Sequence, residues 1–363
     1  ICSIEQDKLI YRGYEIHDLA EHATFEEVAF LLLEGHKPSG EELKRFKAEV
    51  IAERALHPAA TAFIESAGGW LASGRAVPMD VVRTAVSILG HTDPDAQDNS
   101  AAANLRKAKR LLAKIPTIIG HMQNVIDGRA LIGRELGGDP TLGHAANLLY
   151  MMTGRKPSYQ EARTIDVSLI LYAEHEFNAS TFTARVVAST GSDMVSAVVA
   201  AVGALKGPLH GGAPGPVLDM LDAIATPEAA VAWLEGELAA GRRIMGMGHR
   251  IYRVRDPRAA VFERALEALE RAGVATGRLA LARAVEGAAE GVLRARHPTR
   301  PLHANVEFYT AVLLDTLRLP RAVFTPTFAV GRVAGWCAHV REQRAVGRVI
   351  RPASRYVGVT PGA

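Results

Sequence analysis

Ser158-Tyr159-Gln160-Glu161 is the stretch that decides the fold class, because it marks the start of a helix. In such a capping box, the side chains of the first and fourth residues each accept a hydrogen bond from the other residue's free backbone amide. The same pattern occurs at Thr24 to Glu27 and at Ser39 to Glu42. The sequence therefore predicts three well-marked helix starts before its midpoint.

Apolar residues at helical spacing extend this prediction into the second half of the chain. Thr226-Pro227-Glu228 provides a capping residue and a first-turn proline ahead of one such run. In a later run, apolar residues and glutamates occupy opposite faces. The apolar positions of the two runs are Val231, Leu234, Leu238, Phe262, Leu266 and Leu269. Strand signal is confined to Leu9 to Tyr14, so we expect a mainly α protein.

Length and composition indicate a globular protein. The 363 residues are 48% hydrophobic, enough to bury one large core or two ordinary ones. A net charge of +3 argues against a disordered charged tail or a nucleic-acid-coating protein, so strong anion binding has to be local. The longest apolar run, Met194 to Leu205, is shorter than the ~20 residues that cross a bilayer. No signal peptide is visible after Ile1, and we expect no membrane association.

Cysteines and metal-ligand patterns are sparse. Cys2 and Cys337 lie at opposite ends of the sequence, too few for a disulfide scaffold and without metal-ligand spacing, so we expect a cytoplasmic protein. His175-Glu176 begins like a zinc-protease motif, but Ala179 stands where the second histidine is needed. We therefore expect no metal site, and an isolated His175 is more often a hydrogen-bonded helix residue than a functional one.

His210 lies within Lys206 to Gly215, a stretch of glycines and prolines that follows a predicted helix. Glycines let the backbone approach a ligand closely, and an imidazole beside exposed amides tends to stay neutral. A neutral imidazole there suits hydrogen-bond donation to a carbonyl oxygen. The alternative is a tight turn with an incidental histidine.

His249 follows Gly246-Met247-Gly248 in a segment rich in arginine, from Arg242 to Arg258. Guanidinium groups match carboxylates and phosphates two hydrogen bonds at a time, so a small multiply anionic ligand is predicted. The segment lacks the third glycine of a dinucleotide fingerprint, and the chain has no P-loop. A solvated basic surface is the alternative, and nucleic-acid binding is disfavoured because aromatic residues are few.

Glu307 is a further candidate, set among apolar and aromatic neighbours in Asn305 to Tyr309. Such surroundings raise the pKa of a carboxyl group and suit it to proton transfer, although a lone glutamate is more often a helix cap or an ion-pair partner. Arg332 and Arg351 are candidate anion receptors near the end of the chain.

Together these segments resemble the citrate synthase family, which condenses acetyl-CoA with oxaloacetate. The likeness covers nearly the whole chain. Its motifs are Tyr11-Arg12-Gly13-Tyr14, Met79 to Thr84, Ala173 to Arg185, Gly207 to Gly212, Gly248 to Arg258 and Gly331 to Pro352. The resemblance implies a two-domain, almost all-helical fold, with a large domain at residues 1–211 and 319–363 and a smaller mobile domain at residues 212–318. It also implies a homodimer that acts in the tricarboxylic acid cycle.

The resemblance also implies residue roles. His210 would hydrogen-bond the thioester oxygen, Glu307 would remove a proton from the acetyl methyl, and His249 would polarise the ketone of oxaloacetate. The residues that would bind oxaloacetate are His175, Arg258, Arg332 and Arg351, the last from the partner subunit. The residues that would meet CoA are Arg253, Ile244, Gly246 and Gly248. No metal or redox cofactor is implied.

Two positions depart from the family's usual pattern. Glu307 stands where the family generally has aspartate, which moves the carboxylate by about 1.5 Å. Pro214 stands where asparagine is typical and removes an amide near His210. Three functions therefore stay open: a citrate synthase, a 2-methylcitrate synthase that uses propionyl-CoA, and a catalytically silent member. A single methylene separates the first two substrates and is worth only ~1–3 kcal/mol in a pocket.

Overall fold

The computed structural model describes residues 1–5, 7–133, 135, 137–211, 214–249, 252, 254–274, 277–299 and 301–359. Helices dominate these residues, as the sequence predicts. The first elements are β1 (Cys2–Glu5), β2 (Lys8–Tyr11), β3 (Tyr14–Glu15), α1 (Ile16–His22), α2 (Phe25–Glu34), α3 (Gly40–Ala52), α4 (Pro58–Ala72), α5 (Pro78–Thr92), α6 (Ala101–Ile126), α7 (His144–Thr153), α8 (Tyr159–Tyr172), α9 (Ala179–Ser189) and α10 (Met194–Leu205). The later elements are α11 (Pro214–Ile224), the 3-10 turn η1 (Pro227–Ala229), α12 (Ala230–Ala239), α13 (Pro257–Arg271), α14 (Arg278–Arg296), α15 (Val306–Thr316), the 3-10 turn η2 (Arg321–Val323) and α16 (Phe324–Val346).

The predicted helix starts are mostly confirmed. Thr24, Ser39 and Ser158 each form a reciprocal capping box, at the starts of α2, α3 and α8. Thr226 does lie at the N-cap position of η1, with Pro227 in its first turn, but the Thr226 side chain accepts no hydrogen bond there. Instead the Ala229 N–H bonds to the Thr226 carbonyl oxygen at 3.2 Å, which winds a 3-10 turn ahead of α12.

The short strand signal near the N-terminus forms an antiparallel sheet in the order β1-β2-β3. This sheet is tied to the loop that follows α8. The Tyr11 hydroxyl donates to the Glu174 carbonyl oxygen at 2.8 Å and accepts from the Glu174 N–H at 3.2 Å. The Ile4 N–H donates to Glu176 Oε1 at 3.0 Å. The sheet therefore braces a loop that contains one of the candidate histidines.

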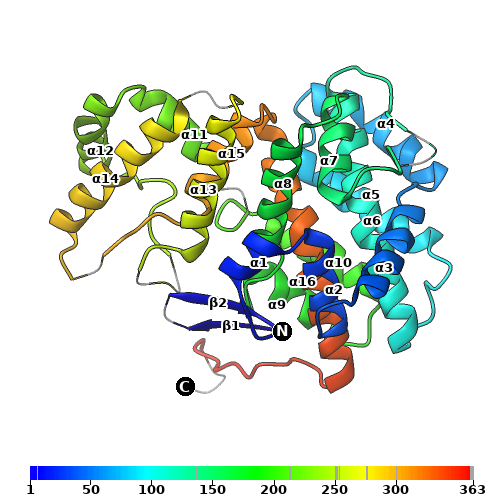
Figure 1. Ribbon diagram of the computed structural model, residues 1–363. Helices are drawn as coiled ribbons and strands as arrows, with labels where there is room; N and C mark the ends of the chain where they lie inside the picture. The colour runs from blue at the N-terminus through cyan, green and yellow to red at the C-terminus, as the bar shows by residue number, and fades with distance from the viewer. Residues whose placement is uncertain are drawn as a thin grey trace.

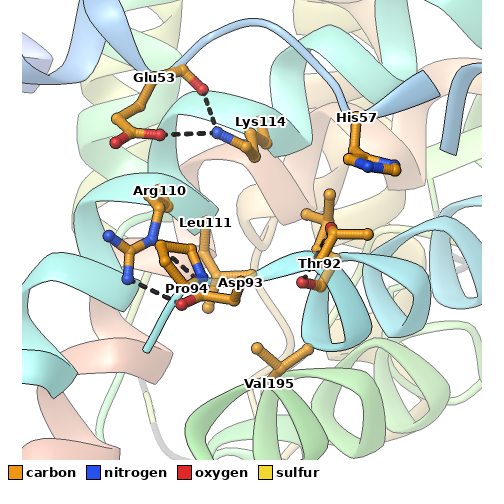
Figure 2. A pocket seen from close by; sticks show the side chains of 10 residues that line it. Glu53, His57, Thr92, Asp93, Pro94, Arg110, Leu111, Lys114 and Val195 are labelled. Atoms are coloured by element: carbon orange, nitrogen blue, oxygen red, sulfur yellow. Dashed lines mark hydrogen bonds and ion pairs between the residues drawn. The ribbon is translucent and has the colours of Figure 1, made fainter. Parts of the chain in front are cut away.

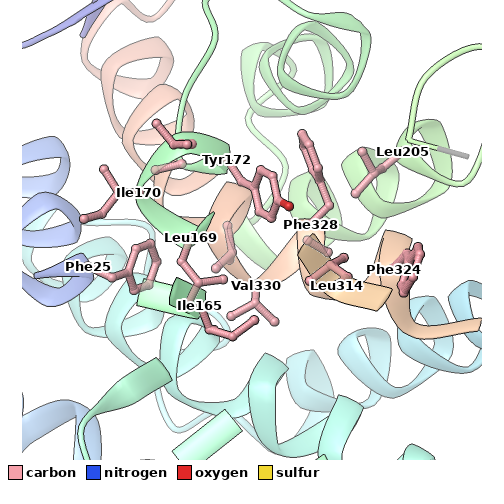
Figure 3. Close-up of a cluster of buried hydrophobic side chains, with 14 of the residues drawn as sticks. Phe25, Ile165, Leu169, Ile170, Tyr172, Leu205, Leu314, Phe324, Phe328 and Val330 are labelled. Carbon is pink, nitrogen blue, oxygen red and sulfur yellow. The ribbon is translucent and has the colours of Figure 1, made fainter. Parts of the chain in front are cut away.

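The core is built where α8 packs against α16, with α15 and α10 beside them (Figure 3). Leu169 of α8, Leu314 of α15 and Val330 of α16 are all fully buried in this cluster. Burying an aliphatic side chain of this size contributes about 1.5–3 kcal/mol. The helices also approach closely at Gly335, where an added Cβ would lie 2.2 Å from the Ala173 carbonyl oxygen. Only glycine fits at this crossing.

The helices gather in two groups (Figure 1). Helices α11 to α15 lie together on one side of the molecule, and α13 contacts the other group through α8 and α1. The division into two domains, one of them mobile, stays a prediction, and Gly212 at its predicted boundary lies outside the described residues. In the described part of the chain, no helix is long and apolar enough to cross a membrane.

Candidate active site

His175 lies in the loop between α8 and α9, where α9 is capped by the Asn178 side chain. The imidazole is 8% exposed, and the backbone N–H of His175 donates to Glu174 Oε1 at 2.8 Å. Its Nε2 is buried and has no hydrogen-bond partner among the described residues. Burial lowers the pKa of His175 well below its usual value, helped by the nearby Arg258 and Arg332. The ring is therefore neutral at physiological pH.

His249 faces His175, with ring centroids 5.4 Å apart and planes at 75°. The backbone N–H of Tyr252 donates to His249 Nδ1 at 3.0 Å. Burial, with a smaller contribution from Arg258, lowers the pKa of His249 to about 4. In a neutral ring whose Nδ1 accepts a hydrogen bond, Nε2 carries the hydrogen. His249 is thus a neutral donor.

His210 occupies the turn after α10, where its backbone N–H bonds to the Gly207 carbonyl oxygen at 2.9 Å. The backbone N–H of Ser180 points at His210 Nε2 from 3.4 Å, and the Ser180 hydroxyl lies 2.8 Å from the same nitrogen. A backbone N–H can only donate, so Nε2 accepts and Nδ1 carries the hydrogen. Burial and the charge of Arg332 lower the pKa of His210 to about 4. The predicted neutrality of this imidazole is confirmed in direction, with burial as its main cause.

Two buried arginines complete the positive side of the site. Arg258, near the start of α13, is 2% exposed and forms a bidentate ion pair with Asp256 at 2.9 and 2.7 Å. Arg332, within α16, is also 2% exposed and donates from Nε to the Tyr172 carbonyl oxygen at 2.5 Å. Its guanidinium carbon lies 4.8 Å from the centre of the Phe328 ring. Nη1 of Arg332 is buried without a partner among the described residues, which suits it to bind an anion.

Glu307 lies in the first turn of α15, and its backbone N–H donates to the side chain of Asn305 at 3.2 Å. Asn305 also donates from Nδ2 to the Gly248 carbonyl oxygen at 2.9 Å, and from its backbone N–H to the Gly246 carbonyl oxygen at 2.9 Å. The segments that carry His249 and Glu307 are thereby joined. Burial raises the pKa of Glu307, against the opposing effect of Arg258, as its apolar neighbours predict.

Three of the four residues predicted to meet CoA belong to the described part of the chain. Ile244 is buried, and Gly246 has a φ of +73°, with an added Cβ falling 2.9 Å from the Phe308 ring. Gly248 is the residue whose carbonyl oxygen Asn305 binds. Arg253 lies outside the described residues. Ile244, Gly246 and Gly248 therefore lie in a supported segment next to His249.

Arg351 does not join the other site residues within one chain. It lies beyond the end of α16, in an extended C-terminal segment, and its side chain is exposed. The site residues that a single chain brings together are His175, His210, His249, Arg258, Glu307 and Arg332.

Several residues that position the candidate site residues were not identified from the sequence. Asp256, before Pro257 at the start of α13, and Asn305, two residues before Glu307, occupy N-cap positions that a cap search finds. Ser180 and Tyr252 gave no such signal, because their contacts with His210 and His249 depend on how the chain folds back.

A separate cavity of about 150 Å³ lies between α5, α6 and the loops around them (Figure 2). Its cationic groups are already paired, since Lys114 bonds to the Glu53 carboxylate at 2.9 Å and Arg110 to Asp93 at 2.8 Å. None of the candidate site residues lines it. Among the described residues, no group of three histidine, cysteine or acidic side chains could hold a metal ion.

Comparison with known proteins gives consistent matches over the full chain. The model of the citrate synthase C-terminal domain matches residues 1–353. A citrate synthase of Deinococcus radiodurans is 39% identical, over 96% of this chain and 89% of that protein. A 2-methylcitrate synthase of Shewanella oneidensis is 41% identical, over 97% and 89%. The solved citrate synthase of Thermoplasma acidophilum, in a ternary complex with carboxymethyl coenzyme A and oxaloacetate, is 27% identical with a TM-score of 0.89, over 100% and 94%.

Proposed function

The chain belongs to the citrate synthase family and is an acyltransferase of the citrate synthase type, and on this premise we propose that it condenses acetyl-CoA with oxaloacetate and hydrolyses the resulting citryl-CoA. The observation that supports these substrates best is a pair of buried nitrogens, His175 Nε2 and Arg332 Nη1, that have no hydrogen-bond partner in the part of the chain that the structure describes. Both groups lie within electrostatic reach of Arg258. A dicarboxylate would accept a hydrogen bond from Arg332 Nη1 and lie next to the Arg258 guanidinium group.

Proton abstraction opens the proposed reaction. The Glu307 carboxylate takes a proton from the acetyl methyl group, and its raised pKa makes it a stronger base than an ordinary glutamate. The thioester oxygen gains negative charge as the enolate forms. His210, whose Nδ1 carries the hydrogen, donates a hydrogen bond to that oxygen.

Carbon–carbon bond formation follows. The enolate carbon attacks the ketone carbon of oxaloacetate, and the electron pair of the C=O bond moves to oxygen. His249 donates from Nε2 to that oxygen and transfers its proton to give the hydroxyl group of citryl-CoA. A proton from solvent restores the neutral imidazole, and Glu307 releases the methyl proton to solvent. Water then hydrolyses the thioester to citrate and CoA. The scheme uses side chains of the protein, the two substrates and water.

Assembly and location belong to the same proposal. The exposed position of Arg351, far along the C-terminal segment, supports a homodimer in which Arg351 of the partner subunit completes each oxaloacetate site. Cys2 and Cys337 are both free thiols, which supports a cytoplasmic location.

Release of the CoA thiol tests the proposal. We expect free CoA from acetyl-CoA only when oxaloacetate is present, with slower release from propionyl-CoA. The Glu307→Gln variant, purified in the same way, serves as the control for contaminating host enzyme. Faster turnover of propionyl-CoA would assign the chain to the 2-methylcitrate synthases, to which it is equally similar. No oxaloacetate-dependent thiol from either donor would refute the proposal.

A further inference from the structure

Tyr252 has a buried hydroxyl group that the reaction described above does not use. The residue is 3% exposed, and its ring centroid lies 4.7 Å from that of His249 and 5.6 Å from that of His175. Its hydroxyl oxygen has no hydrogen-bond partner among the residues that the structure describes. Buried hydroxyl groups are ordinarily paired, because an unpaired one loses its bonds to water without replacement.

The surroundings of this hydroxyl favour donation to an anion. Burial raises the pKa of Tyr252 well above its usual value, so the group stays protonated at any physiological pH. Arg258 is the charged group with the strongest effect on it, followed by Asp256. The hydroxyl therefore shares its environment with one of the two arginines that face the proposed dicarboxylate.

His175 Nε2, Arg332 Nη1 and the Tyr252 hydroxyl are thus buried nitrogen and hydroxyl groups around the same place, and none has a hydrogen-bond partner among the described residues. Each carboxylate of a dicarboxylate has about four lone-pair positions, so it can accept a hydrogen bond from a hydroxyl group as well as from guanidinium groups. We propose that the Tyr252 hydroxyl donates a hydrogen bond to a carboxylate of bound oxaloacetate. This inference rests on the proposed function.

The Tyr252→Phe variant tests this role, because it removes only the oxygen and keeps the ring against both imidazoles. Calorimetry should give a Kd for oxaloacetate raised roughly tenfold or more, the loss typical of a hydrogen bond to a charged group. The KM for oxaloacetate should rise in parallel, while kcat at saturating oxaloacetate and the KM for acetyl-CoA change less than about twofold. The ligand-free Tm should be unchanged or higher, since an unpaired buried hydroxyl is lost.

Tyr309→Phe is the matched control. The Tyr309 hydroxyl donates to Glu286 Oε2 at 2.5 Å, so its removal should lower the Tm and leave the Kd for oxaloacetate unchanged. Wild-type affinity in the Tyr252→Phe variant would overturn the inference and leave the proposed function standing. A wild-type protein that binds no oxaloacetate would overturn both.

Discussion

At the scale of single residues, fixed backbone donors determine the tautomers of the two imidazoles that we propose to be catalytic. The Ser180 and Tyr252 N–H groups cannot turn, and they leave the hydrogen on Nδ1 of His210 and on Nε2 of His249. Sequence reasoning predicts both histidines from the glycine-rich segments that contain them, and the neutrality of His210 from exposed amides at a helix end. It cannot assign the tautomers, because Ser180 lies 30 residues from His210 and reaches it only through the fold.

Replacing Glu307 by glutamine should abolish turnover and leave oxaloacetate binding nearly intact. The amide keeps the size of the side chain but cannot accept the methyl proton, and we expect kcat to fall by about 10³-fold or more. Thiol release gives kcat, and calorimetry gives the Kd for oxaloacetate. Wild-type turnover in this variant would remove Glu307 from the mechanism. The Glu307→Asp variant, which restores the family's usual residue, tests whether the longer side chain costs activity.

The pH profile should follow Glu307 rather than the histidines. With pKa values of about 4, His210 and His249 stay neutral between about pH 6 and pH 8 and add no titration there. A base works when deprotonated, and the pKa of Glu307 is raised, so activity should fall on acidification at a higher pH than an ordinary glutamate would give. A profile of kcat/KM against pH checks this. An imidazole titration near pH 6.5 that vanishes in a His210 or His249 variant would contradict it.

At the scale of elements, the segment before α15 joins residues that are far apart in the sequence. The Gly248 N–H bonds to the His303 carbonyl oxygen at 2.7 Å, and Met247 and Ala304 form an antiparallel bridge. Capping boxes and apolar periodicity predict most helices, because both signals are local. They could not predict this bridge, since its two sides lie more than 50 residues apart and share no pattern.

Substitutions at Asn305 should reduce kcat more than they reduce stability. Asn305→Ala loses both side-chain bonds, and a loosened His249 loop should lower kcat by about tenfold to a hundredfold with a smaller change in the KM for oxaloacetate. Asn305→Asp keeps the acceptor for the Glu307 N–H but loses the donor to Gly248. In the pH profile of this variant, the loss of activity on acidification should begin at a higher pH, because a second carboxylate beside Glu307 raises the pKa of the base.

Ser100→Ala is the control for a simple loss of helix capping. The Ser100 side chain caps α6 through a 3.2 Å bond from the Ala103 N–H, away from the site. This variant should lose about 1 kcal/mol of unfolding free energy and keep its kcat. Thermal unfolding and steady-state kinetics, measured on Asn305→Ala and on Ser100→Ala, separate a loss of stability from a loss of positioning at the site. Equal kcat in Asn305→Ala and wild type would show that the Asn305 side chain does not position His249 and Glu307.

At the scale of the whole molecule, one chain supplies an almost complete site and leaves Arg351 outside it. Sequence patterns predict the helical class and the candidate residues. They do not predict the close crossing of α8 and α16, or the extended, exposed course of the C-terminal segment that carries Arg351. Both depend on packing between distant elements, which local patterns do not encode.

Mixed dimers of two inactive variants should regain activity if Arg351 acts across the interface. A dimer of His249→Ala and Arg351→Ala subunits has one site with both groups intact, so random pairing should restore about a quarter of wild-type turnover. The measurement is thiol release after co-refolding the two variants. Mixing His249→Ala with Glu307→Gln is the control, because both residues belong to one subunit and no intact site forms. No recovery in the first mixture would mean that Arg351 does not cross between subunits.

The glycine crossing of α16 over the end of α8 has a consequence for how the enzyme can be redesigned. The backbones of Ala173 and Gly335 are in contact, so no side chain larger than that of glycine fits at position 335. His175 and Arg332 lie within three residues of this contact, which holds both of them in place. Laboratory evolution toward a different keto acid should therefore stall at these two residues.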